Sequence, residues 1–155
     1  KSVVEEEYGK LDAMVNLVGG FTLGGLQETS KDQFVTSLNV HTTTVFLTVK
    51  EFSDHLEENK GSVVNFSSVK VQDFAKGAVS YTAGKGALTT LTNVLNVELD
   101  NTRVNAVAPD TMDVPGNREA MPDANFEEWT DRNEVLETVK YLLKNKAVDG
   151  ELIRN

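Results

Sequence analysis

The 155-residue sequence contains no cysteine and only two histidines, His41 and His55. Without thiolates it has neither a disulfide framework nor a cysteine zinc site. The two histidines have no further ligand at metal-binding spacing, so we expect no metal site. The absence of cysteine is also what a reducing compartment favours.

Basic residues are scarce: 15 Lys and Arg stand against 24 Asp and Glu, for a net charge of −9. A phosphate backbone or an anionic membrane demands a basic surface, so we expect neither as a partner. No apolar run approaches the length of a membrane span, and none reads as a signal peptide. These absences favour a cytoplasmic globular protein with one domain over residues 1–155.

What the sequence does contain is an alternation of strand-like and helix-like segments. Short apolar runs closed by glycine, serine or proline predict buried strands at 11–18, 61–69, 103–109 and 150–154. Apolar residues at helical spacing predict helices at 29–59, 80–99 and 131–145. Helices between buried strands predict an α/β protein with a parallel sheet and right-handed crossovers.

Ligands of such sheets bind at the carboxyl ends of the strands. Ser67 and Ser68 end the second strand, and Tyr81 and Lys85 share one face of the helix that follows. A free tyrosine has a pKa of about 10, and a nearby ammonium group lowers it toward the range that suits a general acid or base. Taken alone, however, Tyr-x-x-x-Lys is more often an ordinary polar helix face.

Five segments in order, "YGKLDAMVNLVGG", "SLNV", "GSVVNFSS", "YTAGK" and "RVNAVAP", resemble the short-chain dehydrogenase/reductase family. Ser68 lies thirteen residues before Tyr81, which is the family's usual interval. The resemblance covers nearly the whole chain. It implies a Rossmann-like doubly wound parallel sheet and hydride transfer between NAD or NADP and a small carbonyl or alcohol substrate.

The resemblance also implies a role for individual residues. Tyr81 would be the general acid/base, Ser68 would hold the substrate oxygen, and Lys85 would lower the Tyr81 pKa and bind the nicotinamide ribose. Asn39 would keep a water that links Lys85 to solvent. The residues implied in cofactor binding are Asn16, Gly19, Tyr81, Lys85, Pro109 and Met112.

The loop at 113–130 is similar to dihydropteridine reductase and to related prokaryotic members of the family. Such a loop would cover cofactor and substrate, although Phe126 and Trp129 are equally explained as buried anchors of the loop. Dihydropteridine reductases lack the catalytic serine, and this chain has Ser67 and Ser68. We therefore expect a carbonyl or alcohol dehydrogenase, with a pterin reductase as the alternative.

The sequence also departs from the family pattern. The first βαβ unit is absent, with its glycine-rich turn for the cofactor pyrophosphate. Val114 replaces a threonine that contacts the nicotinamide, and the connection from Glu98 to Arg103 is short. We expect the ordered portion of a longer enzyme, with a non-catalytic relative as the alternative. The family's usual pairing of long helices across subunits implies a homodimer or homotetramer.

Overall fold

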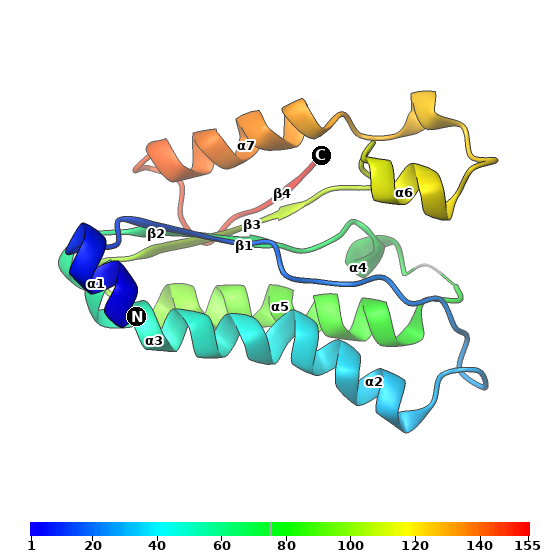
Figure 1. The fold of residues 1–155 in the computed structure, drawn as a ribbon, viewed down its shortest axis with the longest axis horizontal. Coiled ribbons are helices and arrows are strands. Elements are labelled where there is room, and N and C mark those ends of the chain that lie inside the picture. The colour runs from blue at the N-terminus through cyan, green and yellow to red at the C-terminus, as the bar shows by residue number, and fades with distance from the viewer. Residues whose placement is uncertain (75) are drawn as a thin grey trace.

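The computed structural model describes residues 1–74 and 76–155, and a parallel sheet forms its centre (Figure 1). The strands are β1 (Ala13–Asn16), β2 (Ser62–Phe66), β3 (Arg103–Ala108) and β4 (Leu152–Arg154). They lie in the order β1-β2-β3-β4, and each neighbouring pair is parallel. This arrangement confirms the predicted α/β class.

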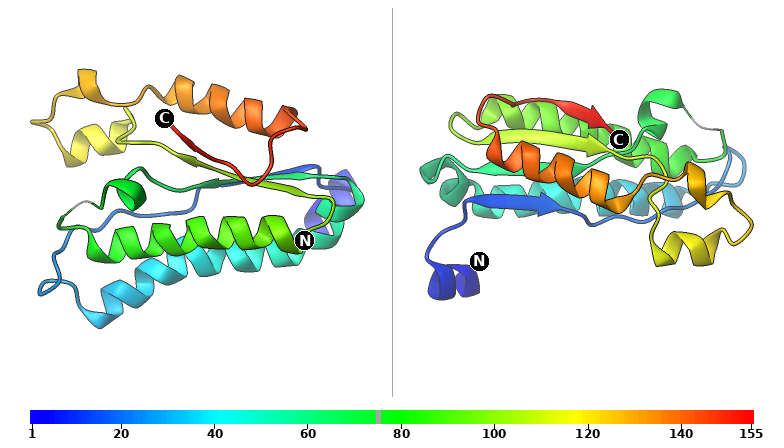
Figure 2. Two further views of the ribbon diagram at one scale, coloured as in Figure 1. Left: turned by 180° about the vertical axis from the view of Figure 1, so that it is seen from behind. Right: turned by 90° about the horizontal axis from the view of Figure 1, so that it is seen from above.

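Helices cover both faces of the sheet (Figures 1 and 2). One face carries α3 (Thr44–Glu58) and α5 (Val79–Glu98), and the other carries α7 (Arg132–Lys144). The short helix α1 (Ser2–Tyr8) precedes β1 and lies at one end of the sheet. The sheet is therefore doubly wound, as the resemblance to Rossmann-like proteins implied.

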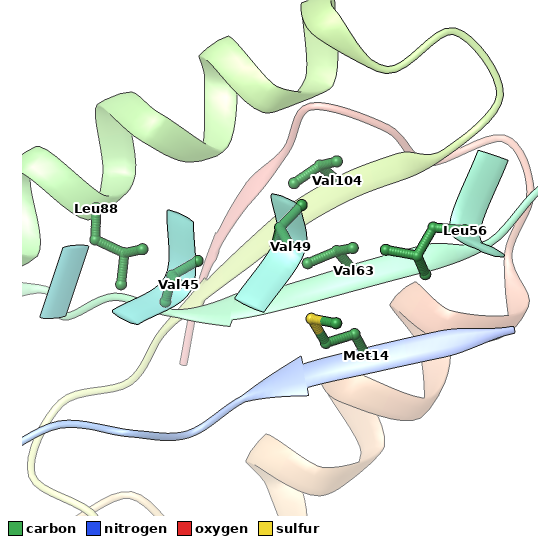
Figure 3. Packing of buried hydrophobic residues seen from close by; sticks show 7 residues of the cluster. All are labelled: Met14, Val45, Val49, Leu56, Val63, Leu88 and Val104. Carbon is green, nitrogen blue, oxygen red and sulfur yellow. The ribbon is translucent and has the colours of Figure 1, made fainter. Parts of the chain in front are cut away.

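The core consists of two layers because successive residues of a strand point to opposite faces. On β2, Val63 belongs to the layer beneath α3 and α5, whereas Val64 belongs to the layer beneath α7. Figure 3 shows the first layer, which consists of Met14, Val45, Val49, Leu56, Val63, Leu88 and Val104. Burial on both faces explains why the strands read as continuous apolar runs.

The helix predicted at 29–59 is interrupted by one wide turn. It begins as α2 (Lys31–Leu38), passes through a π-helical turn, η1 (Asn39–Thr43), and continues as α3. Ser30 and Gln33 form a capping box at its start. π-helical turns are rare and are often found at functional sites.

Two short helices lie in the predicted loop at 113–130, α6 (Pro115–Ala120) and η2 (Phe126–Glu128), and a third, α4 (Lys70–Asp73), follows the strand predicted at 61–69. Each of these helices is too short to show a periodic apolar pattern, so local contacts determine whether the segment is helical. In the described part of the chain, no helix is both long and apolar enough to cross a membrane.

Candidate active site

A cleft of about 440 Å³ lies at the carboxyl ends of β1, β2 and β3. Its polar wall includes Ser68, Tyr81 and Lys85. The other lining residues come from the loops after the strands and from α6: Leu17, Gly19, Gly20, Phe21, Leu23, Phe66, Ser67, Lys70, Pro109, Asp110, Thr111, Met112, Asn117 and Met121. The structure therefore brings three of the four predicted catalytic residues together.

Tyr81 and Lys85 stand one turn apart near the start of α5, beside the end of β2. The Lys85 ammonium is buried and donates a hydrogen bond to the Phe66 carbonyl oxygen. Ser68 lies within hydrogen-bonding reach of the Tyr81 hydroxyl and also accepts a bond from the Lys70 backbone N–H. The strand end and the helix thus hold the three polar groups in one place.

Burial controls the electrostatics of this pair. It raises the pKa of Tyr81 above its usual value; the Ser68 contact opposes the rise, and the negative charge of Asp110 adds to it. Burial also lowers the pKa of Lys85 to about 8. The sequence led us to expect that Lys85 lowers the Tyr81 pKa. Instead, the ammonium is directed to Phe66, and the loss of hydration dominates the pKa of Tyr81.

The loop that follows β1 supplies an aromatic contact to Tyr81. The Phe21 and Tyr81 rings meet edge to face with their centroids 4.8 Å apart. Gly24 fixes this loop to the start of α5, because its N–H donates to the Gly77 carbonyl and its carbonyl accepts from the Val79 N–H. Phe21 is thereby placed against the phenol, a position that no sequence pattern indicated.

The fourth predicted catalytic residue, Asn39, lies elsewhere. Its side chain is exposed and its carboxamide oxygen accepts a hydrogen bond from Thr43; it does not belong to the described lining of the cleft. His41, to which the sequence analysis assigned no role, lies two residues further along and faces inward. It is only 1% exposed, and its ring meets Tyr81 edge to face at 5.4 Å.

A signal in the sequence did point to His41. It lies four residues before Val45 and eight before Val49, and so continues the buried stripe of α3 back into η1. A histidine on such a stripe is placed in the interior by the helix itself. Because the family resemblance indicated Asn39, His41 was not predicted.

The predicted cofactor-binding residues are divided between the cleft and the sheet. Gly19, Pro109 and Met112 line the cleft together with Tyr81 and Lys85. Asn16 does not belong to that described lining: its side-chain amide donates to the buried Asn65 carboxamide at 2.8 Å. Its part in cofactor binding stays a prediction.

The lack of a side chain at Gly19 keeps the space between Lys85 and His41 open. A Cβ atom at Gly19 would lie 3.4 Å from Lys85 Nζ and 3.1 Å from His41 Cε1, so only glycine leaves this corner open. The ammonium has donors beyond its bond to Phe66, and ribose hydroxyls accept such bonds. The residues present therefore suit the sugar of a nicotinamide cofactor.

The outer wall of the cleft is more exposed. Asn117 of α6 donates to the Met112 carbonyl oxygen, and Arg118 pairs with the Asp113 carboxylate. The Arg118 guanidinium lies over the Phe126 ring at 4.6 Å, and Phe126 packs against Trp129. Neither aromatic belongs to the described lining of the cleft, so both are explained as anchors of the loop.

Fold and cleft together define a protein of the Rossmann type, with its polar residues at the carboxyl ends of the strands. The family model described as short chain dehydrogenase matches residues 2–125. The chain belongs to this family.

Similarity to individual proteins supports the same family assignment. The chain is 35% identical over 112 residues to cyclopentanol dehydrogenase of Comamonas testosteroni, which covers 70% of this chain and 45% of that protein. It is 33% identical over 108 residues to meso-2,3-butanediol dehydrogenase of Serratia marcescens, with 68% and 43% covered. The crystal structure of acetoin dehydrogenase from Enterobacter cloacae superposes with a TM-score of 0.86 at 26% identity and covers 99% of this chain and 66% of that one. The chain thus spans slightly less than half the length of these two curated relatives.

Proposed function

We propose that the protein is an NAD(P)-dependent oxidoreductase that reduces a carbonyl or oxidises an alcohol. The observation that carries this proposal is the meeting of Ser68, Tyr81 and Lys85 in one cleft at the carboxyl ends of the strands. Family membership and the dehydrogenases among its relatives support the same reaction class.

The protein's own residues handle the proton of this reaction. When bound, the nicotinamide cofactor would supply or accept the hydride. Because its pKa is raised, Tyr81 is protonated at neutral pH and can donate its proton to a carbonyl oxygen. Ser68 would donate a second hydrogen bond to that oxygen as negative charge develops on it.

Lys85 and Gly19 would hold the nicotinamide ribose, since the ammonium and the open corner at the glycine lie side by side. Pro109 and Met112 would contact the nicotinamide from the loop after β3, and Asn16 would contact the adenosine side. Because a buried ammonium binds hydroxyl oxygens strongly, Lys85 is expected to contribute most of this affinity.

The substrate we propose is a small, largely apolar ketone or secondary alcohol. The lining of the cleft includes the apolar residues Phe21, Leu23, Met112 and Met121 beside the polar ones. The relatives that act on cyclopentanol and 2,3-butanediol suggest substrates of this size. A pterin substrate is less well supported, because Ser68 is in place beside Tyr81 and the loop aromatics pack on each other.

A homodimer or homotetramer is part of the proposal. Apolar side chains of α3 and α5 are exposed, among them Leu47 at 55% and Val97 at 81%. Pairing of these helices between subunits would cover them.

The test uses the full-length protein. Binding of NADH and NADPH is measured by fluorescence titration, followed by turnover of a panel that includes cyclopentanone, acetoin and a quinonoid dihydropterin. Tyr81→Phe is expected to lose about three orders of magnitude in kcat. The control, Tyr141→Phe, changes an exposed tyrosine on α7. Failure of the wild-type protein to bind either cofactor would favour a non-catalytic relative.

A further inference from the structure

Two aromatic rings contact Tyr81, and they differ in their access to the cleft. The His41 ring, whose centroid lies 5.4 Å from that of Tyr81, is almost completely buried. The Phe21 ring, with its centroid at 4.8 Å, lines the cleft, and the residue is 51% exposed. A molecule that reaches the Tyr81 hydroxyl through the cleft can therefore contact Phe21, whereas His41 is covered.

The loop that carries Phe21 is fixed to α5 by its backbone. The Gly24 N–H donates to the Gly77 carbonyl at 2.8 Å, and the Gly24 carbonyl accepts from the Val79 N–H at 3.2 Å. The Thr29 hydroxyl donates to the same Gly24 carbonyl. Figure 1 shows the loop running from the end of β1 toward the start of α5. These bonds hold the backbone three residues after Phe21 against the helix that carries the tyrosine.

The cleft is small for the molecules that the proposed function requires it to hold. Its volume of about 440 Å³ lies in the lower part of the range of roughly 300–1,000 Å³ found for ligand sites. The nicotinamide ring and the substrate must share this space. Leu17 and Leu23 line the cleft from the same loop, but both are more exposed than Phe21. The Phe21 ring is thus the part of this loop that takes up space next to Tyr81.

We propose that Phe21 determines substrate specificity by limiting the bulk that a substrate carries next to its carbonyl carbon. This proposal rests on the proposed function, in which Tyr81 donates its proton to the carbonyl oxygen. The carbonyl carbon is bonded to that oxygen, so a wide substituent on the carbon meets the ring that packs against the phenol. A single small ring such as that of cyclopentanone fits, whereas a second ring fused beside the carbonyl collides with Phe21.

A different role for Phe21 would be to shield Tyr81 from water. Burial raises the pKa of Tyr81, and a neighbouring phenyl ring contributes to that burial. Loss of shielding would change the turnover and the pH profile for every substrate alike. Loss of a size limit changes the ratio of the rates for a wide and a narrow substrate. Two ketones of unequal width therefore separate the two roles.

The test measures kcat/KM of the full-length protein for cyclopentanone and for 1-indanone, in which a benzene ring is fused beside the carbonyl. Phe21→Ala should raise the ratio of 1-indanone to cyclopentanone about tenfold, a change typical of altered hydrophobic pockets. Phe21→Leu should raise it less, and the larger side chain of Phe21→Trp should lower it. Both rates come from one enzyme sample, so the ratio does not depend on how much of a variant is folded.

Leu26→Ala is the matched control. Leu26 is an exposed apolar residue of the same loop and does not belong to the described lining of the cleft, so the ratio should stay within about twofold of wild type. If Phe21→Ala is too unstable to assay, the direction of change in Phe21→Leu decides.

An unchanged ratio in the Phe21 variants would overturn the inference, and so would equal changes for both ketones, which would assign shielding to Phe21. If wild-type protein binds no cofactor and reduces neither ketone, the proposed function fails. If wild type reduces cyclopentanone and the ratio does not respond to the residue at position 21, the inference fails alone.

Discussion

The two walls of the cleft are built differently. The inner wall, formed by Ser68, Tyr81 and Lys85, stands on a strand end and a long helix and is largely buried. The outer wall, formed by residues 109–121, is a loop with one short helix, held by the exposed Asp113–Arg118 pair. Side chains that must contact a reacting atom need the rigid support of a buried strand end and helix. A wall that selects substrates can be built from an exposed loop.

The largest expected contrast lies within the inner wall itself. Ser68→Ala removes the hydroxyl next to Tyr81 and should lower kcat/KM about a hundredfold, because a transition-state hydrogen bond is lost. Ser67 is its neighbour, but its hydroxyl is bonded to Thr89 at 2.6 Å. Ser67→Ala should therefore cost about 1 kcal/mol of stability and little activity. Steady-state kinetics and thermal unfolding of both variants check the assignment, and equal kinetic losses would refute it.

The buried ammonium of the inner wall should make stability depend on pH. Lys85 has a folded-state pKa of about 8, below the ordinary value of 10.5. Between these values the unfolded chain binds more protons than the folded one, so the free energy of unfolding rises with pH, by about 3 kcal/mol in total. Urea unfolding from pH 7.5 to 10.5 measures this rise.

This rise in the free energy of unfolding should disappear in Lys85→Met. It should persist in Lys140→Met, which changes an exposed lysine on α7. A rise that survives in Lys85→Met must come from another group.

Glycines give a matched test of packing in the two walls. A Cβ atom at Gly84 would lie 2.8 Å from Ser37 Oγ and 3.0 Å from the Ser37 carbonyl oxygen, so Gly84→Ala should destabilise the fold by about 2 kcal/mol. A Cβ atom at Gly116 of α6 would meet nothing within 4 Å, and Gly116→Ala should stay within about 1 kcal/mol of wild type. Thermal unfolding measures the stability of both variants. Similar losses of stability would show that the outer wall is packed as tightly as the inner wall.

The smallest effect on activity should come from substitution of Asp110, a residue of the outer wall whose negative charge acts on Tyr81 of the inner wall. Its exposed carboxylate raises the Tyr81 pKa. Asp110→Asn should therefore lower the pH at which alcohol oxidation reaches half of its maximum, by less than about half a unit, because solvent screens the charge. The pH profile of kcat measures this shift; an upward displacement would contradict the sign.

The sequence predicted secondary structure well in segments that carry a continuous run or a regular stripe of buried residues. Strands such as β2 and β3 are apolar runs closed by Ser67 or Pro109, and the long helices carry regular stripes, so their order and the parallel sheet could be predicted. The short helices could not, because α6 depends on Pro115 at its start and on contacts such as the one between Asn117 and Met112.

The candidate site was predictable in part for a related reason. Ser68, Tyr81 and Lys85 lie at fixed spacing on elements whose type was clear. The position beside Lys85 was harder, because Asn39 and His41 are two residues apart on one helix. The spacing of His41 to the buried Val45 and Val49 indicated that His41 faces inward, but the family resemblance indicated Asn39.

That wide turn carries a consequence for the length of the chain. Each residue of an α-helix advances the direction of its side chain by about 100°, so one surplus residue in η1 sets α2 and α3 out of phase. Deleting a single residue from 39–43 would restore the ordinary winding and rotate Ser37 away from Gly84. An insertion or deletion at this point would therefore change which side chain of the turn faces Lys85.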